Sequence, residues 1–401
     1  MGNCLSDKYY KVEKNENNQI IYEGSYKNKK KHGFGIEYSN NKKIYEGQWY
    51  NDKKFGCGTL YDNNENVCYT GELLDNKKNG VGIEKYKNYI LYEGQWTNNN
   101  KHGYGKLYYK DSTIVFFDGH FLNNKKNGPG KIFYNNNNIK INGFWSNDFL
   151  INGTEFWNNG NCKYQGCFKN DKYFGNSIIY YDNGNVYYEG NLLNGYKHGF
   201  GITYNNTNNG NNGNNANNSN NANILYEGEW KTNMKHGYGV LYEDNSIIYK
   251  GMFKNDFKSG KGHLYINNIY YRGSFVNDLK QGYGTLFVNN KLSYIGMFHM
   301  NYKHGKGKLY EDNMLIYDGD FYNNSKEGHG ILYYKNTNNI LYDGQWSNDL
   351  RSGFGILYYP NQIILYKGNW INNMTHNYGE EYDKNGVLVY KGEWKYNERC
   401  N

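Results

Sequence analysis

The sequence predicts an all-β protein built from tandem antiparallel β-hairpins. Three observations lead to this prediction. The composition is rich in aromatic residues and glycine, a short unit recurs along nearly the whole chain, and large apolar residues alternate with a period of two inside each unit.

The composition favours strands and turns over helices. The 401 residues are 18% aromatic and include 50 glycines but only 2 prolines. Tyr, Trp and Phe favour strands, and glycine favours tight turns. No stretch approaches the length of about 18 apolar residues that a transmembrane helix needs. Residues 1–6 also lack the apolar segment of a secretory signal, so we expect none.

The repeating unit has two halves. Residues Tyr22–Tyr26 (YEGSY) are followed by Lys31–Gly35 (KHGFG), and the pair returns as Tyr226–Trp230 (YEGEW) with Lys235–Gly239 (KHGYG). The first glycine of each unit marks sixteen units at spacings of 22 to 25 residues, with one step of 38. These glycines are Gly24, Gly47, Gly71, Gly94, Gly119, Gly143, Gly166, Gly190, Gly228, Gly251, Gly273, Gly296, Gly319, Gly344, Gly368 and Gly392.

The longer step contains residues 205–223, a tract dominated by asparagine with a few Gly, Ser, Thr and Ala residues. Such a tract has nothing to bury, so we expect a disordered loop. The sequence therefore predicts four parts: a flexible, polar N-terminal tether (1–19), repeats one to eight (20–204), the loop (205–223) and repeats nine to sixteen (224–401).

Aromatic or other apolar residues stand two positions before and two positions after the first glycine. This spacing places aromatic, glycine and aromatic on one face of a strand. A hairpin then suggests a register in which Tyr226 lies opposite Leu241, Gly228 opposite Gly239, and Trp230 opposite Gly237. The glycines would leave room for the large rings that lie across them.

The YEGxW…KHGxG pattern resembles the MORN repeat family over roughly residues 20–397. Two units depart from it, because the sixth has Gly153 one place late and the seventh has Ser177 in place of a glycine. These units are a candidate kink or weak point. The resemblance implies an elongated, single-layer, twisted antiparallel sheet.

A single layer would leave the aromatic face to be covered by its own long side chains, a second copy of the chain, or a partner. We therefore expect a partner-binding aromatic face. Its candidate residues are Tyr22, Tyr26, Trp49, Trp96, Tyr226, Trp230, Trp346, Trp370 and Trp394.

The first six residues, MGNCLS, match the N-myristoylation pattern, with Gly2 as the acylated amine. One myristoyl chain binds membranes only marginally, so a second signal is needed. Cys4 is placed for palmitoylation. Lys29, Lys30 and Lys31, in the first predicted hairpin loop, would add attraction to an anionic leaflet.

Three patterns resemble chemical sites, and each has a simpler interpretation. The KHG histidines fall in successive loops, which favours a turn role over metal binding or catalysis. The acidic residue before the first glycine becomes lysine or arginine in later units, as on a solvated face. Cys162 and Cys167 have no second pair to complete a zinc site. We therefore expect no catalytic residue, metal or cofactor, and reduced cytosolic thiols.

Lysines recur in the predicted loops, and stacked hairpins would align them as a basic rail. The net charge of +8 and such a rail would suit acidic lipid or acidic protein, and a charged edge also prevents aggregation. No nucleic-acid-binding module is recognisable, so nucleic acid is not an expected partner. The rail lysines are Lys53, Lys54, Lys77, Lys78, Lys125, Lys126, Lys197, Lys235 and Lys303.

The repeats leave no segment of about 100 residues for a catalytic domain, so we expect a non-enzymatic scaffold. Acylation would hold it at the cytoplasmic face of the plasma membrane or of an internal or pellicular membrane. There it would recruit protein partners or link membrane to cytoskeleton. The resemblance implies a partner helix in the sheet groove, cytoskeletal components or a second copy as partners. The alternatives are a regulatory arm for a partner enzyme such as a lipid kinase, and direct binding of acidic phospholipid by the repeats.

Overall fold

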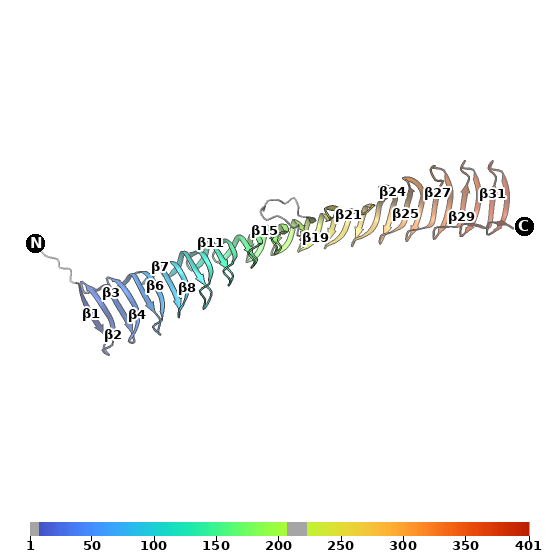
Figure 1. Ribbon diagram of the computed structural model, residues 1–401. Coiled ribbons are helices and arrows are strands. Elements are labelled where there is room, and N and C mark those ends of the chain that lie inside the picture. Colours follow the sequence, from blue (N-terminus) through green and yellow to red (C-terminus); the bar gives the residue numbers. More distant parts are fainter. Residues whose placement is uncertain (1–7, 207–222, 401) are drawn as a thin grey trace. The chain divides into compact units, whose positions relative to one another are not determined.

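The computed structural model describes residues 8–206 and 223–400, and every regular element in these residues is a β-strand (Figure 1). The chain divides into two compact units, Met1–Tyr196 and Lys197–Asn401. In each unit, strands that follow one another in sequence pair antiparallel and form a single layer. This architecture confirms the predicted all-β sheet of tandem hairpins.

Within residues 8–196, the first unit contains sixteen strands. They are β1 (Lys8–Lys14), β2 (Ile20–Lys27), β3 (Lys30–Ser39), β4 (Lys42–Tyr50), β5 (Lys53–Tyr61), β6 (Val67–Leu74), β7 (Lys77–Tyr86), β8 (Tyr89–Thr97), β9 (Asn100–Tyr108), β10 (Val115–Leu122), β11 (Lys125–Phe133), β12 (Ile139–Ser146), β13 (Phe149–Phe156), β14 (Cys162–Lys169), β15 (Lys172–Tyr180) and β16 (Val186–Leu193).

The second unit contains the remaining strands. They are β17 (Tyr196–Tyr204), β18 (Ile224–Lys231), β19 (Met234–Glu243), β20 (Ser246–Lys254), β21 (Phe257–Ile266), β22 (Ile269–Val276), β23 (Leu279–Val288), β24 (Lys291–His299), β25 (Tyr302–Glu311), β26 (Met314–Tyr322), β27 (Ser325–Tyr333), β28 (Ile340–Ser347), β29 (Leu350–Tyr358), β30 (Ile364–Ile371), β31 (Met374–Tyr382), β32 (Leu388–Lys395) and β33 (Glu398–Arg399).

The N-terminal end of the array differs from the sequence prediction. The flexible tether predicted for residues 1–19 is wrong over Lys8–Lys14, because this segment forms β1 and pairs with β2. Tyr9 stacks on Tyr26 at 5.4 Å, which gives the added strand an anchor. At the other end of the described residues, β32 is followed by the short strand β33, which pairs Arg399 with Trp394.

The predicted register is right at the glycines and wrong at the tryptophan. Tyr226 pairs with Leu241 and Gly228 with Gly239, as expected, but Trp230 pairs with Lys235. The register shifts by two residues because the strand bulges at Gly237, whose φ of +61° is a left-handed conformation that glycine adopts readily. Trp230 therefore faces a glycine of the preceding strand instead, Gly199.

Asn and Asp fill the hairpin turns for two physical reasons. Asn51 and Asp52 form a two-residue turn with φ values of 47° and 67°, the left-handed pair that a tight hairpin requires and that these residues tolerate. Asp52 also binds the preceding repeat, because its Oδ1 accepts the Lys31 backbone N–H at 2.8 Å. Its own N–H donates to the Lys31 carbonyl at 3.1 Å. The turns are thus hydrogen-bonded from one repeat to the next.

The two units meet between Tyr196 and Lys197, whereas the sequence suggested a division at residues 205–223. Asn205 donates its backbone N–H to the Asn223 carbonyl at 2.9 Å, so the two ends of the asparagine-rich segment lie together. Residues 207–222 fall outside the described residues, and disorder there stays a prediction.

Candidate interaction surface

One face of the sheet, which we call the ring face, packs a tyrosine over a pair of glycines in most repeats. In repeat nine, the ring of Tyr226 lies across Gly228 and Gly239. A Cβ on Gly239 would come within 2.5 Å of the Tyr226 Cζ, so no larger residue fits unless the ring moves. The Tyr226 hydroxyl donates to the carbonyl of Glu229 at 3.0 Å and is therefore satisfied. This slot explains the tyrosine and both glycines together.

Rings of neighbouring repeats meet edge to face. Tyr226 contacts Trp230 of its own repeat at 5.0 Å and Phe253 of the next repeat at 5.3 Å, at angles of 82° and 88°. Each such pair contributes about 0.5–1.5 kcal/mol beyond its buried area. Five tryptophans also donate Nε1–H to a glycine carbonyl of the preceding repeat, at 2.9–3.3 Å: Trp49, Trp96, Trp230, Trp346 and Trp370.

A cation folds over the ring pair in most repeats. The Lys326 Nζ lies 5.5 Å from the ring centre of Tyr317 and 4.9 Å from that of Trp346. Burial against the rings lowers the pKa of Lys326. We call the residues in this position the cap residues: Lys31, Lys54, Lys78, Lys101, Lys126, Lys197, Lys235, Lys258, Lys280, Lys303, Lys326, Arg351 and Arg399.

The caps overturn the expectation of an exposed aromatic face. The nine candidate rings are only 0–8% exposed: Tyr22, Tyr26, Trp49, Trp96, Tyr226, Trp230, Trp346, Trp370 and Trp394. The chain's own side chains cover this face, which was one of the three covers considered from the sequence. These rings form the core of the sheet and present no open docking surface.

The caps also divide the predicted basic rail into two kinds of lysine. The first lysine of a pair, as in Lys53 and Lys77, is exposed at the turn. The second, as in Lys54 and Lys78, lies on the rings and is not available to a lipid headgroup. The same holds at the first hairpin. Lys29 and Lys30 are exposed at the turn, whereas Lys31 Nζ lies 4.4 Å from the Tyr22 ring centre and 4.9 Å from the Trp49 ring centre.

Replacing a cap residue should therefore cost stability, and replacing its neighbour should not. We expect Lys31→Ala to lower the free energy of unfolding by about 1–2 kcal/mol, because it removes a cation–π contact and uncovers two rings. Lys30→Ala removes the same charge from an exposed site and should change it by less than about 0.5 kcal/mol. Urea denaturation followed by circular dichroism measures both. Equal effects would contradict a capping role.

Repeats six and seven, the predicted weak point, replace the cap with other side chains. Leu150 pairs with Trp145 in the position that a lysine occupies elsewhere. In repeat seven, Tyr173 stacks on Tyr164 at 3.7 Å with an interplanar angle of 5°. Ser177, in place of the glycine, shares a 2.8 Å hydrogen bond with the Tyr164 hydroxyl. Strand pairing continues through both repeats, so the altered residues do not interrupt the sheet.

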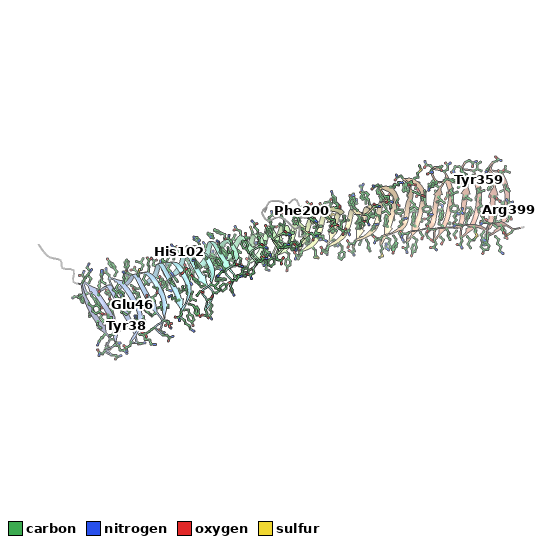
Figure 2. All side chains as sticks on the ribbon, in the orientation of Figure 1. Tyr38, Glu46, His102, Phe200, Tyr359 and Arg399 are labelled. Atoms are coloured by element: carbon green, nitrogen blue, oxygen red, sulfur yellow. The ribbon has the colours of Figure 1, made fainter. Side chains whose placement is uncertain are left out.

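The opposite face, which we call the outer face, carries a row of exposed apolar residues that the sequence analysis missed. Side chains line both faces of the strands (Figure 2), and within the described residues no further layer of structure covers them. The row comes from the middle residue of Gly-x-Gly, which is Asn377-x-Gly379 in repeat fifteen, and the frequent apolar character of this position was the available signal. Its members are 47–62% exposed: Phe34, Val81, Tyr104, Phe200, Tyr238, Tyr283, Phe354 and Tyr378.

The acidic residues before the first glycine also lie on the outer face, partly exposed. Glu23 accepts a hydrogen bond from the Tyr38 hydroxyl at 2.7 Å, and Glu46 forms an ion pair with Lys43 at 2.8 Å. Lys43, then the Tyr61 hydroxyl, lowers the pKa of Glu46 against the opposing effect of burial. Such exposed pairs contribute little to stability.

The histidines and cysteines do not converge. Each KHG histidine belongs to a different repeat, for example His32 in β3 and His102 in β9. Cys162 and Cys167 lie five residues apart on β14 and so point to opposite faces. In the part of the chain that the structure describes, no three His, Cys, Asp or Glu side chains are placed to hold a metal ion. No helix there is suited to cross a membrane. Gly2 and Cys4 lie outside the described residues.

Comparison with known families agrees with the observed hairpins. The model of the MORN repeat matches fifteen segments and passes over the divergent sixth repeat; the segments are 22–43, 45–67, 69–89, 92–114, 117–139, 164–186, 188–208, 226–247, 249–268, 271–291, 294–314, 317–338, 342–363, 366–387 and 390–400. A search of the curated proteins finds no significant match. MORN repeats generally serve as scaffolds for protein or membrane interactions and are not typically catalytic. Since the matched segments cover more than half of its length, the chain belongs to the MORN-repeat family.

Proposed function

We propose that this protein is a membrane-tethered scaffold, held at the cytoplasmic face of a membrane by acyl groups on Gly2 and Cys4. Its sheet recruits protein partners or links the membrane to the cytoskeleton. The observation that carries the scaffold role is the uncovered outer face, with its row of half-exposed aromatic side chains. Exposed apolar side chains that recur along one face in this way are typical of interaction sites.

The ring face supports the proposal in a different way. Its aromatic residues are buried in the core, and its cap residues and turns contact the neighbouring repeats. Each unit of the sheet therefore supports the outer face, and the partner role moves from the buried rings to that face. Lys29 and Lys30, exposed at the first turn, would each add about 1 kcal/mol of attraction to an anionic leaflet.

Localisation of Gly2→Ala in cells tests the tether. We expect the membrane-bound fraction to fall about tenfold, because a protein without the myristoyl chain loses the anchor on which a second acyl group depends for stable attachment. Membrane fractionation and fluorescence imaging measure the change. Asn3→Ala is the matched control, since position three is unconstrained in the acylation pattern. An unchanged membrane pattern for Gly2→Ala would refute acylation as the tether.

A further inference from the structure

Within each unit, strand pairing aligns one residue of each strand in a row along the outer face. We call this the charge row, and it passes through the residue before each first glycine. In the second unit it runs Glu227, Val240, Lys250, His263, Arg272, Thr285, Ile295, Lys308, Asp318, Ile331, Asp343, Ile356, Lys367, Glu380 and Lys391.

Lysines elsewhere in the charge row have an acidic neighbour. Lys308 lies 2.9 Å from Asp318, and Lys391 lies 2.8 Å from Glu380. Lys367 lies directly opposite Glu380 as well. The first unit follows the same rule, for example with Lys106 and Glu93 at 3.7 Å.

Lys250, His263 and Arg272 break this rule. They occupy three successive strands, β20 to β22, and the next residues of the row on either side are Val240 and Thr285. Within residues 8–206 and 223–400, neither Lys250 nor Arg272 forms an ion pair. Like charges on directly opposed strands destabilise a sheet. Burial, Arg272 and Lys250 together lower the pKa of His263, which relieves part of this repulsion by favouring the neutral ring.

Exposed apolar residues flank the same three strands. Met252 is 42% exposed on β20, and Tyr283 is 62% exposed on β23. Lys261, exposed on β21, lies between them in the neighbouring row and also forms no ion pair among the described residues. The surface thus combines uncompensated cations with uncovered Met and Tyr side chains.

We infer that the patch formed by Lys250, Lys261, Arg272, Met252 and Tyr283 binds an acidic segment of a partner protein. Carboxylates of that segment would lie on the cations, and its apolar side chains would cover Met252 and Tyr283. The inference rests on the proposed scaffold role and names the class of partner that this face takes.

The charge row favours a protein segment over a membrane surface. The three cationic strands span only about 10 Å at the usual strand spacing. Beyond them the row turns acidic again at Glu227 and Asp318. A flat anionic bilayer lying along the row would meet those carboxylates, whereas a narrow peptide segment can follow the cations alone.

Binding of a fluorescein-labelled peptide of alternating Glu and Leu residues to the purified, unacylated full-length chain tests the inference. Lys250→Gln, Lys261→Gln and Arg272→Gln are combined in one patch variant. We expect about a tenfold loss of affinity in this variant, and we expect wild-type binding to weaken as salt rises. The same peptide with Gln in place of Glu should bind neither protein. The melting temperature should not fall, because uncompensated cations have been removed.

Lys308→Gln, Lys367→Gln and Lys391→Gln form the matched control, with the same change in net charge on lysines of the same row that lie opposite an acidic residue. It should alter peptide affinity less than twofold. Equal losses in both variants, or no loss in the patch variant, would overturn the inference. So would a patch variant that binds the peptide normally but no longer binds phosphatidylcholine vesicles containing one-fifth phosphatidylserine. Because the protein is unacylated, the outcome is independent of the localisation of Gly2→Ala.

Discussion

Gly284→Ala is expected to lower the free energy of unfolding by about 3 kcal/mol, since it closes the slot that holds a buried ring. A Cβ at this position would lie 2.5 Å from the Tyr271 Cε2 and 2.6 Å from its Cζ. The Tyr271 ring is fully buried and contacts Phe275 at 5.2 Å and Phe298 at 5.1 Å, so displacing it disturbs two repeats. Because each repeat is stabilised mainly by its neighbours, we also expect a new, lower thermal transition in circular dichroism.

Gly282→Ala is a control two residues away in the same strand. Its Cβ would have room, with the nearest side-chain atom, Ser274 Cβ, at 3.9 Å. The φ of +73° still penalises an alanine, by about 1 kcal/mol. A loss for Gly284→Ala no larger than that for Gly282→Ala would show that the ring does not depend on the glycine slot.

The period of two was sufficient to predict the strands, the glycine pair and the shared face of Tyr226, Gly228 and Trp230. It failed at Trp230 because the turn and the glycines impose different registers. The two-residue turn fixes Trp230 opposite Lys235, while the glycine pair fixes Gly228 opposite Gly239, and the difference of two residues is absorbed by the bulge. Counting from the turn as well as from the glycines would have predicted that bulge.

The direction of the cap residues could not be predicted in the same way. A lysine such as Lys326 lies beside its exposed turn in sequence, and only the three-dimensional packing decides whether its stem extends into solvent or folds over Tyr317 and Trp346. For this reason the sequence identified the aromatic residues of the ring face correctly but wrongly predicted that they form an exposed surface. The exposed Gly-x-Gly residues form a weaker pattern than the rings, because Cys57, Lys261 and Lys306 occupy the same position in other repeats.

Burial of the tyrosines makes the fold sensitive to alkali. Burial raises the pKa of thirteen ring-face tyrosines from the usual 10, to about 12 in Tyr271 and Tyr366; the others are Tyr22, Tyr45, Tyr69, Tyr92, Tyr164, Tyr188, Tyr226, Tyr249, Tyr294, Tyr317 and Tyr342. Unfolded tyrosines ionise near pH 10, whereas the folded ones keep their protons. The stability contributed by these groups is therefore complete below pH 10 and is lost as pH rises above it.

Three cap residues oppose this trend only in part. Burial lowers the pKa of Lys280, Lys303 and Lys326, so these lysines lose their protons at a lower pH in the folded state than in the unfolded state. Their contribution to stability therefore rises with pH until the unfolded lysines titrate near pH 10.5. A group that is protonated in one state and deprotonated in the other changes the free energy of unfolding by about 1.4 kcal/mol per pH unit. The thirteen tyrosines outnumber the three lysines, so the net effect is a loss of stability as pH rises above 10.

We therefore expect cooperative unfolding within about one pH unit above pH 10, with the β-sheet signal and the buried tyrosinate absorbance changing together. Circular dichroism and absorbance near 295 nm, recorded on the same samples, measure the β-sheet content and the tyrosinate fraction.

Tyr294→Phe should make the loss of stability with pH less steep, because it removes one titrating group. It also removes a 3.0 Å hydrogen bond to the Met297 carbonyl. The exposed Tyr283→Phe controls for the loss of a hydroxyl outside the ring stack and should leave the cooperative transition in place. Sheet structure that survives while all tyrosines ionise would contradict the slot, because a ring held across two glycines in an apolar stack cannot carry a charge without leaving it.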